Sequence, residues 1–284
     1  MESPTPFPPC DLCGGGNPRF LLKSKRLDGP LVECTRCGFR YVGNQTLNLA
    51  FGTESAHLTA ARVSEANTVF RRLSLTEEHR LAALNAQWRL KLIRTIKPSG
   101  KLLEAGCARG DFMRVAGEYF EVSGVEPNAE LAAVASQIAP VHQDIIERTP
   151  WSGFDVIVSF HVIEHVSSPR SFVRAAAERL QSGGLMVIET PNIDSLPYKI
   201  LRSRWRQFIP EHYFFFDRKT IVRLLSDCGL RTEDVRSIGK YASLDLITNR
   251  LSRYMRWMPH SNGFSRLTFR INPLDIMLVF ATKL

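Results

Sequence analysis

The sequence predicts an α/β protein whose main sheet is parallel and covered by helices on both faces. The first observation is that short strand-like segments alternate with helical segments between residues 101 and 190, the pattern of a parallel sheet. The second is that a glycine-containing turn follows the first of these strands. The third is that 284 residues, 44% of them hydrophobic, are enough for one well-buried domain and a smaller unit.

The elements of this sheet can be assigned in chain order. A long helical period at residues 75–96 comes first; Thr76 could cap it, and the Pro98-Ser99-Gly100 stretch ends it. Strands are expected at 101–105, 120–126, 141–144, 154–160 and 184–190. Helices are expected at about 111–119, 128–138, 169–181 and 217–228. Parallel sheets of this kind bind ligands at the carboxyl ends of their strands.

Four of the six cysteines form two CxxC pairs near the N-terminus, and these are Cys10, Cys13, Cys34 and Cys37. A disulfide staple would not persist in a reducing compartment, and a redox motif would be a single CxxC between a strand and a helix. The spacing therefore indicates a four-cysteine zinc site, with Gly14 and Gly38 providing the tight turns. Because four thiolates leave zinc no open position, we expect this zinc to be structural.

No targeting or membrane-spanning segment is evident in the sequence. The N-terminus lacks a basic head followed by an apolar run, and the longest apolar stretches fall short of the roughly 18 residues that span a bilayer. The remaining cysteines, Cys107 and Cys228, fit small buried side chains. We expect a cytoplasmic protein.

The turn EAGCARGD after the first strand indicates where a ligand binds. Small residues at Gly106, Ala108 and Gly110 let the backbone approach a ligand closely. A dinucleotide site would require G-x-G-x-x-G, and here Ala108 and Asp111 stand where the second and third glycines belong. A nicotinamide cofactor is thus disfavoured.

Residues from about 84 to 283 resemble the class I S-adenosylmethionine (SAM)-dependent methyltransferases. The family's first-strand motif, acidic-x-G-x-G-x-G, is matched from Glu104 to Gly110 with Ala108 at the middle glycine. The resemblance implies a Rossmann-like seven-stranded sheet whose last strand is antiparallel, with strands at 230–239 and 275–283 completing it. It also implies SAM as the cofactor. The cofactor-binding residues it implies are Glu104, Gly106, Ala108, Gly110, Glu126, Asp144 and Phe160.

Two acids have specific roles in this resemblance. Glu126 would accept hydrogen bonds from both ribose hydroxyls, for which a carboxylate has two acceptor oxygens. Asp144 falls where the family places an acid against the adenine amino group. Taken singly, each acid could equally be a helix N-cap or a solvated loop charge.

A later segment resembles quinone-biosynthesis and sugar methyltransferases. It runs from Glu164-His165 through a helix and the Gly183-Gly184 turn to Pro191-Asn192. The aromatic and basic stretch at about 192–216 then suggests a substrate lid. The chain thus divides into a zinc-ribbon module (1–45), a linker and helical segment (46–98) and the SAM-binding core (99–284).

Basic residues concentrate in the last third of the chain. Residues 199–284 hold 16 of the 37 lysines and arginines but only 7 of the 28 acidic residues, which accounts for the whole formal net charge of +9. A helix at about 241–258 would carry three arginines on one face. This charge suggests that the acceptor is a small or lipid-linked anion. It also suggests that this helix contacts the inner face of the membrane peripherally. Ordinary arginines in contact with solvent would explain the charge equally well.

Histidines near the expected acceptor position are the candidate proton acceptors. His161 and His165 follow the fourth strand of the sheet, and the Glu211-His212 pair lies in the expected lid. Each could instead be a structural side chain, and His212 is the first choice. Glu211-His212 also resembles part of the Tyr-x-Glu-His element of zinc-containing deoxysugar C-methyltransferases, but Ile209 stands in place of the tyrosine.

The sequence therefore predicts a methyltransferase for a small or lipid-linked metabolite, with a sugar or surface-glycan intermediate as the first choice. A polyprenyl-phenol O-methyltransferase fits the core equally well. An RNA methyltransferase guided by the ribbon stays open, although no aromatic-basic strand pattern for base stacking is present. A non-catalytic binding module that retains the fold is a further alternative.

Overall fold

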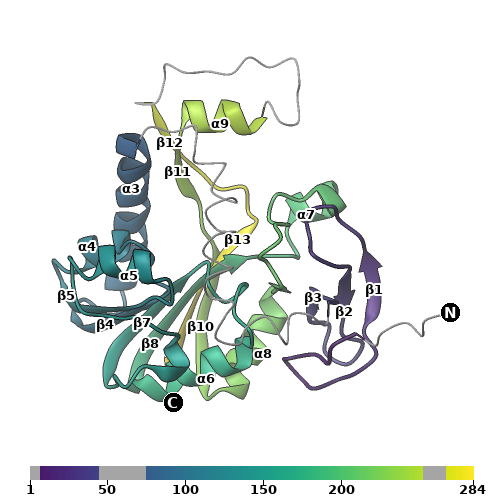
Figure 1. Cartoon of the computed structure of the whole chain (residues 1–284), viewed down its shortest axis with the longest axis horizontal. Helices are drawn as coiled ribbons and strands as arrows, with labels where there is room; N and C mark the ends of the chain where they lie inside the picture. Colours follow the sequence, from purple (N-terminus) through teal and green to yellow (C-terminus); the bar gives the residue numbers. More distant parts are fainter. Residues whose placement is uncertain (1–6, 45–74, 252–266) are drawn as a thin grey trace.

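A seven-stranded sheet forms the larger part of the computed structural model, which describes residues 7–44, 75–251 and 267–284 (Figure 1). Its strands are β4 (Gly100–Ala105), β5 (Phe120–Val125), β6 (Val141–His142), β7 (Phe154–Phe160), β8 (Leu180–Pro191), β10 (Leu230–Ser237) and β13 (Ile276–Lys283). They lie in the order β10-β13-β8-β7-β4-β5-β6. The strands from β4 to β8 pair in parallel and β13 is antiparallel to both its neighbours, which confirms the predicted sheet.

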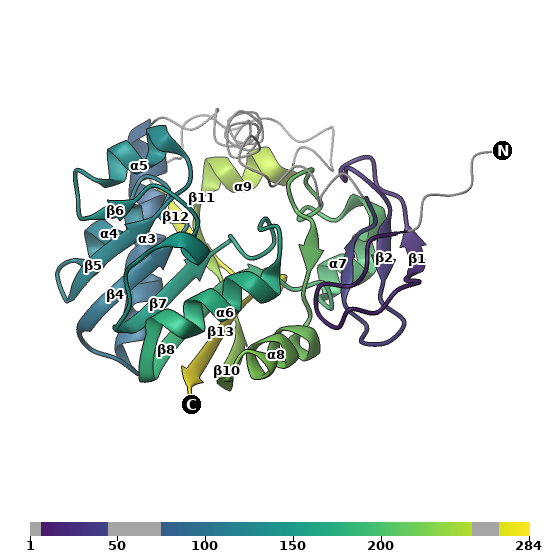
Figure 2. The same cartoon turned by 60° about the horizontal axis from the view of Figure 1, so that its bottom comes forward.

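Helices cover both faces of this sheet because its strands are apolar on both sides. The main covering helices are α3 (Leu75–Arg94), α4 (Asp111–Ala116), α5 (Ala129–Ala135), α6 (Pro169–Arg179) and α8 (Arg218–Asp227). On β7, Val156 and Val158 pack with α3 and α4, while Ile157 faces the core that α6 and α8 complete (Figure 2). This alternation follows the two-residue period of a strand.

A second sheet joins the N-terminal region to a distant part of the chain. It consists of β1 (Arg19–Leu22), β2 (Leu31–Glu33), β3 (Arg40–Val42) and β9 (Phe214–Phe215), in the order β1-β2-β3-β9. β9 is antiparallel to β3, and the Val42 N–H donates to the Tyr213 carbonyl at 2.9 Å. The small N-terminal sheet is therefore completed by a strand from the expected lid.

The cysteine-rich loop also docks directly on the main domain. Asp11, which lies between the first two cysteines, accepts hydrogen bonds from Ser168 Oγ at 2.7 Å and from the Arg170 N–H at 2.9 Å, both at the start of α6. A carboxylate is favourable at this position because helix N-termini carry partial positive charge. On the apolar side, Phe39 lies parallel to Phe214, with ring centroids 5.9 Å apart. The two units thus share one hydrophobic core.

Residues between β8 and β9 form a compact layer over the small sheet. This layer contains α7 (Leu196–Leu201) and the 3₁₀ turn η3 (Arg202–Arg204). Trp205, Phe208 and Phe215 are buried together, and the Phe208 ring packs edge to face with Trp205 and with Phe215, at centroid distances of 5.4 and 5.2 Å. Edge-to-face aromatic packing of this kind stabilises a core beyond the area it buries.

The predicted start of the C-terminal helix was wrong. Residues 241–243 of the expected 241–258 helix belong to strand β11 (Lys240–Ser243), which pairs with β12 (Thr268–Ile271). The helix, α9, begins only at Leu244 and is described to Leu251. Backbone pairing with a strand some 28 residues away overrides the local helical period, and the rest of the expected helix lies outside the described residues.

Among the helices that the structure describes, none is long and apolar enough to cross a membrane.

Candidate active site

The turn after β4 presents backbone rather than side chains at the carboxyl edge of the sheet. Gly106 has φ +76°, and a Cβ placed there would lie 2.4 Å from Val162 Cγ2. Gly110 has φ +78°, and its Cβ would lie 2.7 Å from Ile138 Cδ1. Ala108 adopts φ 46°, where a single methyl is tolerated. The sequence reason for small residues in this turn is therefore visible as close packing.

Glu126 and Asp144 lie at the same edge, after the next two strands. Glu126 follows β5 and is 8% exposed; its Oε2 accepts the Ala108 N–H at 3.0 Å and its Oε1 accepts the Asn128 N–H at 2.9 Å. Burial raises the pKa of Glu126 in spite of these bonds. Asp144 follows β6, is more exposed and accepts a hydrogen bond from Arg148 at 3.3 Å.

Glu104 is the third acid, and its environment is unusual. The side chain is 5% exposed, and Oε2 has no hydrogen-bond partner among the described residues. Burial raises the pKa of Glu104 to about 8, although the Arg89 charge works in the opposite direction. A buried carboxyl with a free oxygen is suited to a ligand that brings a positive charge.

Val162 packs against Gly106 and so places the segment that carries the histidines beside this edge of the sheet. Val162 lies in the segment that follows β7, between His161 and Glu164. Phe160, the last residue of β7, packs edge to face on Phe112 at 4.8 Å. The Arg89 guanidinium lies 4.5 Å from the centre of the Phe160 ring.

His161 is fixed by polar contacts at both ring nitrogens. Nδ1 lies 3.0 Å from Glu164 Oε1, and Nε2 lies 2.8 Å from Glu189 Oε1 and 2.6 Å from Lys240 Nζ. Its backbone has φ 58°, which is uncommon for a residue with a side chain. With both nitrogens engaged, His161 is a poorer candidate for a free proton acceptor than the other two histidines.

Glu189 and Glu164 carry buried negative charge beside this ring. Arg89 makes a bidentate contact with Glu189, at 2.7 and 2.8 Å. Burial would raise the pKa of Glu189, but the Arg89 and Lys240 charges hold it well below its ordinary value. For Glu164, burial acts in the same way, but the hydrogen bond from His161 and the electrostatic effect of the three nearby histidines together outweigh it and lower the pKa to about 2.

His165 and His212 lie against each other, and within the described residues each ring makes its hydrogen bond through Nδ1. Their rings meet edge to face at 4.6 Å. His165 Nδ1 is 2.8 Å from the Glu211 carbonyl, and His212 Nδ1 is 2.7 Å from the Gln207 carbonyl. Because a carbonyl can only accept, each Nδ1 carries a hydrogen and each Nε2 keeps its lone pair.

Together with Glu164, these two histidines form a three-residue donor cluster. His212 Nε2 lies 3.9 Å from Glu164 Oε1, and one donor atom of each of the three residues falls within 4.8 Å of the others. Burial, followed by the neighbouring His165, lowers the pKa of His212 to about 3, and burial lowers that of His165. Glu211 is also buried, and its Oε2 has no partner in the described parts of the chain. Neutral imidazoles held through Nδ1 by carbonyls are the form in which histidine binds divalent ions.

The four N-terminal cysteines converge as the spacing predicts. Their sulfurs lie within 4.8 Å of one another, with the Cys10–Cys37 and Cys13–Cys34 pairs at 3.5 Å. A tetrahedral zinc site with Zn–S bonds of about 2.3 Å requires sulfurs about 3.8 Å apart. Gly14 and Gly38 both adopt positive φ, and their N–H groups donate to the carbonyls of Cys10 and Cys34. The four thiols are therefore gathered closely enough to suit a zinc ion.

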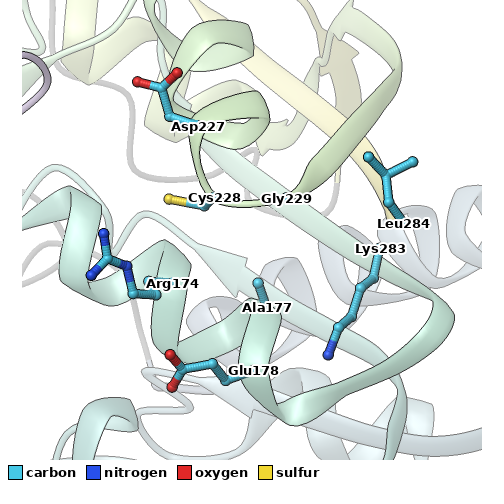
Figure 3. A pocket seen from close by; sticks show the side chains of 8 residues that line it. All are labelled: Arg174, Ala177, Glu178, Asp227, Cys228, Gly229, Lys283 and Leu284. Carbon is cyan, nitrogen blue, oxygen red and sulfur yellow. The ribbon is translucent and has the colours of Figure 1, made fainter.

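A surface pocket of 460 Å³ lies at the opposite edge of the main sheet, between α6, the start of β10 and the end of β13 (Figure 3). The side chains that Figure 3 shows around it include Arg174, Glu178 and Cys228. None of the predicted site residues lines it.

Comparison with known proteins identifies the family. A family model described as "Methyltransferase domain" matches residues 77–235, more than half of the chain. The chain belongs to this methyltransferase family. The matched range contains every cofactor-binding and catalytic residue predicted above.

Individual relatives of this methyltransferase agree. The chain is 25% identical over 154 residues to the ubiquinone biosynthesis O-methyltransferase of Ruegeria sp., covering 49% of this chain and 62% of that protein. It is 26% identical over 175 residues to the tRNA U34 carboxymethyltransferase of Tolumonas auensis, covering 57% and 52%. The chain thus spans somewhat more than half the length of these curated relatives.

The fold also has a solved counterpart. A SAM-dependent methyltransferase of Thermotoga maritima, described as a possible histamine N-methyltransferase, superimposes with a TM-score of 0.54 at 19% identity, covering 80% of this chain and 99% of that one. The chain therefore shares the fold of this solved protein in addition to the sequence pattern of the methyltransferase family. The buried, unpaired Glu104 oxygen and the turn without large side chains fit a cofactor that carries a positively charged ammonium and sulfonium.

Sequence reasoning missed the charge network of Arg89, Glu189 and Lys240. A single acid inside the apolar strand GLMVIET is a usable signal, because a buried acid needs a partner. Its partners come from α3 and β11, and nothing local in the sequence identifies them.

We predict that SAM binding at pH 7.5 releases between about half and one proton per cofactor, because a cation beside Glu104 lowers a pKa that is about 8 in the free protein. Calorimetry in phosphate and in Tris measures this release as a difference in apparent enthalpy. Glu104→Gln should abolish the difference, and Glu178→Gln, which alters an exposed acid at the opposite edge, should retain it. Equal enthalpies in both buffers for the unmodified protein would rule the prediction out.

Proposed function

We propose that this methyltransferase transfers the methyl group of SAM to a hydroxyl of a small or lipid-linked metabolite. The observation that supports this most strongly is the cluster of Glu164, His165 and His212, which lies beyond the segment that packs on the cofactor turn. A hydroxyl must lose its proton to accept a methyl group, and this cluster offers two uncharged Nε2 atoms and an ionised carboxylate for that purpose. Bound SAM supplies the activated methyl group.

The roles within the cofactor site follow from the contacts. We assign the ribose hydroxyls to Glu126, the adenine to Asp144 and the positively charged methionine portion to Glu104. The turn from Gly106 to Gly110 and the Phe160 ring complete this site. The assignment rests on the shared edge of the sheet and on the family resemblance.

The histidine cluster could assist the reaction in two ways, by binding a metal ion or by accepting the proton directly. A pKa of about 3 makes His212 a weak proton acceptor but keeps it neutral, the form that metal binding requires. We therefore favour a divalent ion held by Glu164, His165 and His212, which would lower the pKa of the acceptor hydroxyl. Direct proton transfer to His212, with the Glu164 carboxylate 3.9 Å away, is the alternative.

For the acceptor itself, a hydroxyl is supported by the ubiquinone biosynthesis O-methyltransferase among the relatives. Neither relative reported above is named for a sugar, so the sugar or surface-glycan acceptor predicted from the sequence gains no support from them. Because one relative is named for the modification of tRNA, RNA is included among the acceptors to be tested.

The test is labelled-methyl transfer from SAM to prenylated phenols, nucleotide sugars, lipid-linked glycans and RNA in parallel, with and without a chelator. We predict transfer to a hydroxyl-bearing metabolite. His212→Asn should lower kcat by about 100-fold or more, within the range for loss of acid-base assistance, without changing SAM affinity. Glu126→Ala should instead weaken SAM binding by about 1.5–3 kcal/mol, the range for hydrogen bonds to a charged group.

His79→Asn, which changes an exposed histidine on α3, is the matched control and should behave like the unmodified protein. Activity that chelation abolishes and a divalent ion restores supports the metal action, and activity that chelation leaves intact supports direct proton transfer. Failure of the purified protein to bind SAM would overturn the proposal.

We also propose that the four N-terminal cysteines hold a structural Zn²⁺. Cys34→Ser should remove about one equivalent of zinc and lower the free energy of unfolding by several kcal/mol, because metal binding contributes directly to folding. Elemental analysis and urea unfolding measure the two effects. Cys228→Ser, a half-buried cysteine outside the cluster, should keep the zinc; full zinc content in Cys34→Ser would contradict the assignment.

A further inference from the structure

Five exposed basic side chains from two distant parts of the chain form one surface, which we call the basic patch. Three follow β1 and two belong to η3, and they are Lys23, Lys25, Arg26, Arg202 and Arg204. The Ser24 hydroxyl donates to the Ser203 carbonyl at 2.8 Å, which ties the two segments together across 179 positions of sequence. In both views α7 lies next to the small N-terminal sheet (Figures 1 and 2).

Ion pairing distinguishes the basic patch from the strands beside it. Within the described ranges, none of its five side chains has an ion-pair partner. Basic residues on the neighbouring strands differ, because Arg19 and Arg40 both contact Glu33, at 2.6 and 2.9 Å. An uncompensated cluster of this size produces a positive potential that attracts polyanionic surfaces.

Next to the basic patch, α7 exposes two aliphatic side chains. Leu196 and Ile200, one helical turn apart, are 61% and 69% exposed, among the most exposed large apolar residues in the described chain. The opposite side of α7 is anchored, since Tyr198 is 7% exposed and packs on Trp205 with ring centroids 5.4 Å apart. The exposed pair is therefore held outward by a fixed helix rather than by a loose loop.

We infer that the basic patch and the α7 aliphatic pair form a peripheral docking surface for a membrane that contains anionic lipids. Lysine and arginine contact the headgroups, and aliphatic side chains enter the boundary between headgroups and acyl chains. The exposed aliphatic pair favours a lipid surface over RNA, whose recognition uses aromatic stacking and phosphate contacts. The inference concerns a different surface from the C-terminal helix of the sequence prediction.

A short segment of the chain links this surface to the histidine cluster. Trp205 follows η3 directly and is buried with Phe208, which precedes Glu211 and His212 by only a few residues. Docking through α7 and η3 would bring the segment that carries His212 to the membrane, where a lipid-linked acceptor lies. Membrane binding itself does not rest on the proposed acceptor, so each can fail without the other.

The test is co-sedimentation of the full-length protein with vesicles of phosphatidylcholine alone and with about 30% phosphatidylglycerol. We expect binding to the anionic vesicles that weakens as salt rises, because ions screen the attraction. Arg202→Glu/Arg204→Glu should lower the partition coefficient at least about tenfold. Leu196→Ser/Ile200→Ser should lower it on vesicles while leaving retention on a heparin column unchanged, because heparin offers charge without an acyl layer.

The matched control is Lys101→Glu/Lys219→Glu, which reverses two exposed cations at the start of β4 and of α8. It should bind vesicles like the unmodified protein. SAM affinity is measured for every variant. A variant that binds SAM normally but not vesicles has lost the docking surface and not the fold.

Three results would overturn the inference. The first is equal binding to neutral and anionic vesicles, or no binding to either. The second is a loss of vesicle binding in the Lys101→Glu/Lys219→Glu control, or in Arg253→Glu/Arg256→Glu, that equals or exceeds the loss in Arg202→Glu/Arg204→Glu. The third is tRNA that competes with vesicles and binds Leu196→Ser/Ile200→Ser as tightly as the unmodified protein, which would identify an RNA surface.

Discussion

The rest of the site depends on the contact between Gly106 and Val162. A side chain at position 106 would lie 2.4 Å from Val162, and the backbone there has φ +76°, so only glycine permits this approach. Because the approach is made, the turn after β4 lies directly against the segment that carries His161, Glu164 and His165. The cofactor turn and the histidine cluster can therefore act as one site, although β7 brings them together from different parts of the sequence. Burial at this edge affects its carboxyl groups differently. Glu104 Oε2 has no partner among the described residues, and the pKa of Glu104 is raised. Glu189 lies beside Arg89 and Lys240, Glu164 lies beside three histidines, and the pKa values of both are lowered.

The N-terminal cysteine module has a structural connection to this site. β3 pairs with β9, which begins two residues after His212, and the His165 ring is held by the Glu211 carbonyl. Asp11 fixes the other side of the module to the start of α6. A metal bound by the cysteines would therefore stabilise the position of the histidine-bearing segment without approaching the reaction. This arrangement gives a closed, four-sulfur site a role that does not require an open coordination position.

Features that depend on local pattern were predictable from the sequence, and features that depend on distant pairing were not. The β7 strand has its predicted bounds, because a continuous apolar run between polar turns is a local signal. The Gly106 turn was predictable because small residues at fixed offsets are local as well. The incorporation of β9 into the N-terminal sheet and the contact of Arg89 with Glu189 join residues 100 or more positions apart, which no local period reveals. The predicted start of the C-terminal helix failed for the same reason, since β12 captures residues 240–243.

The claim that the cofactor turn and the histidine cluster form one site can be tested by nuclear magnetic resonance. The protein, labelled with ¹⁵N in its histidine rings, would be titrated with S-adenosylhomocysteine, and the signals of His161, His165 and His212 assigned by single substitutions. We predict that the signals of this cluster shift and saturate at the same ligand concentration as binding measured by calorimetry. Binding that leaves all three histidine signals unchanged would contradict it.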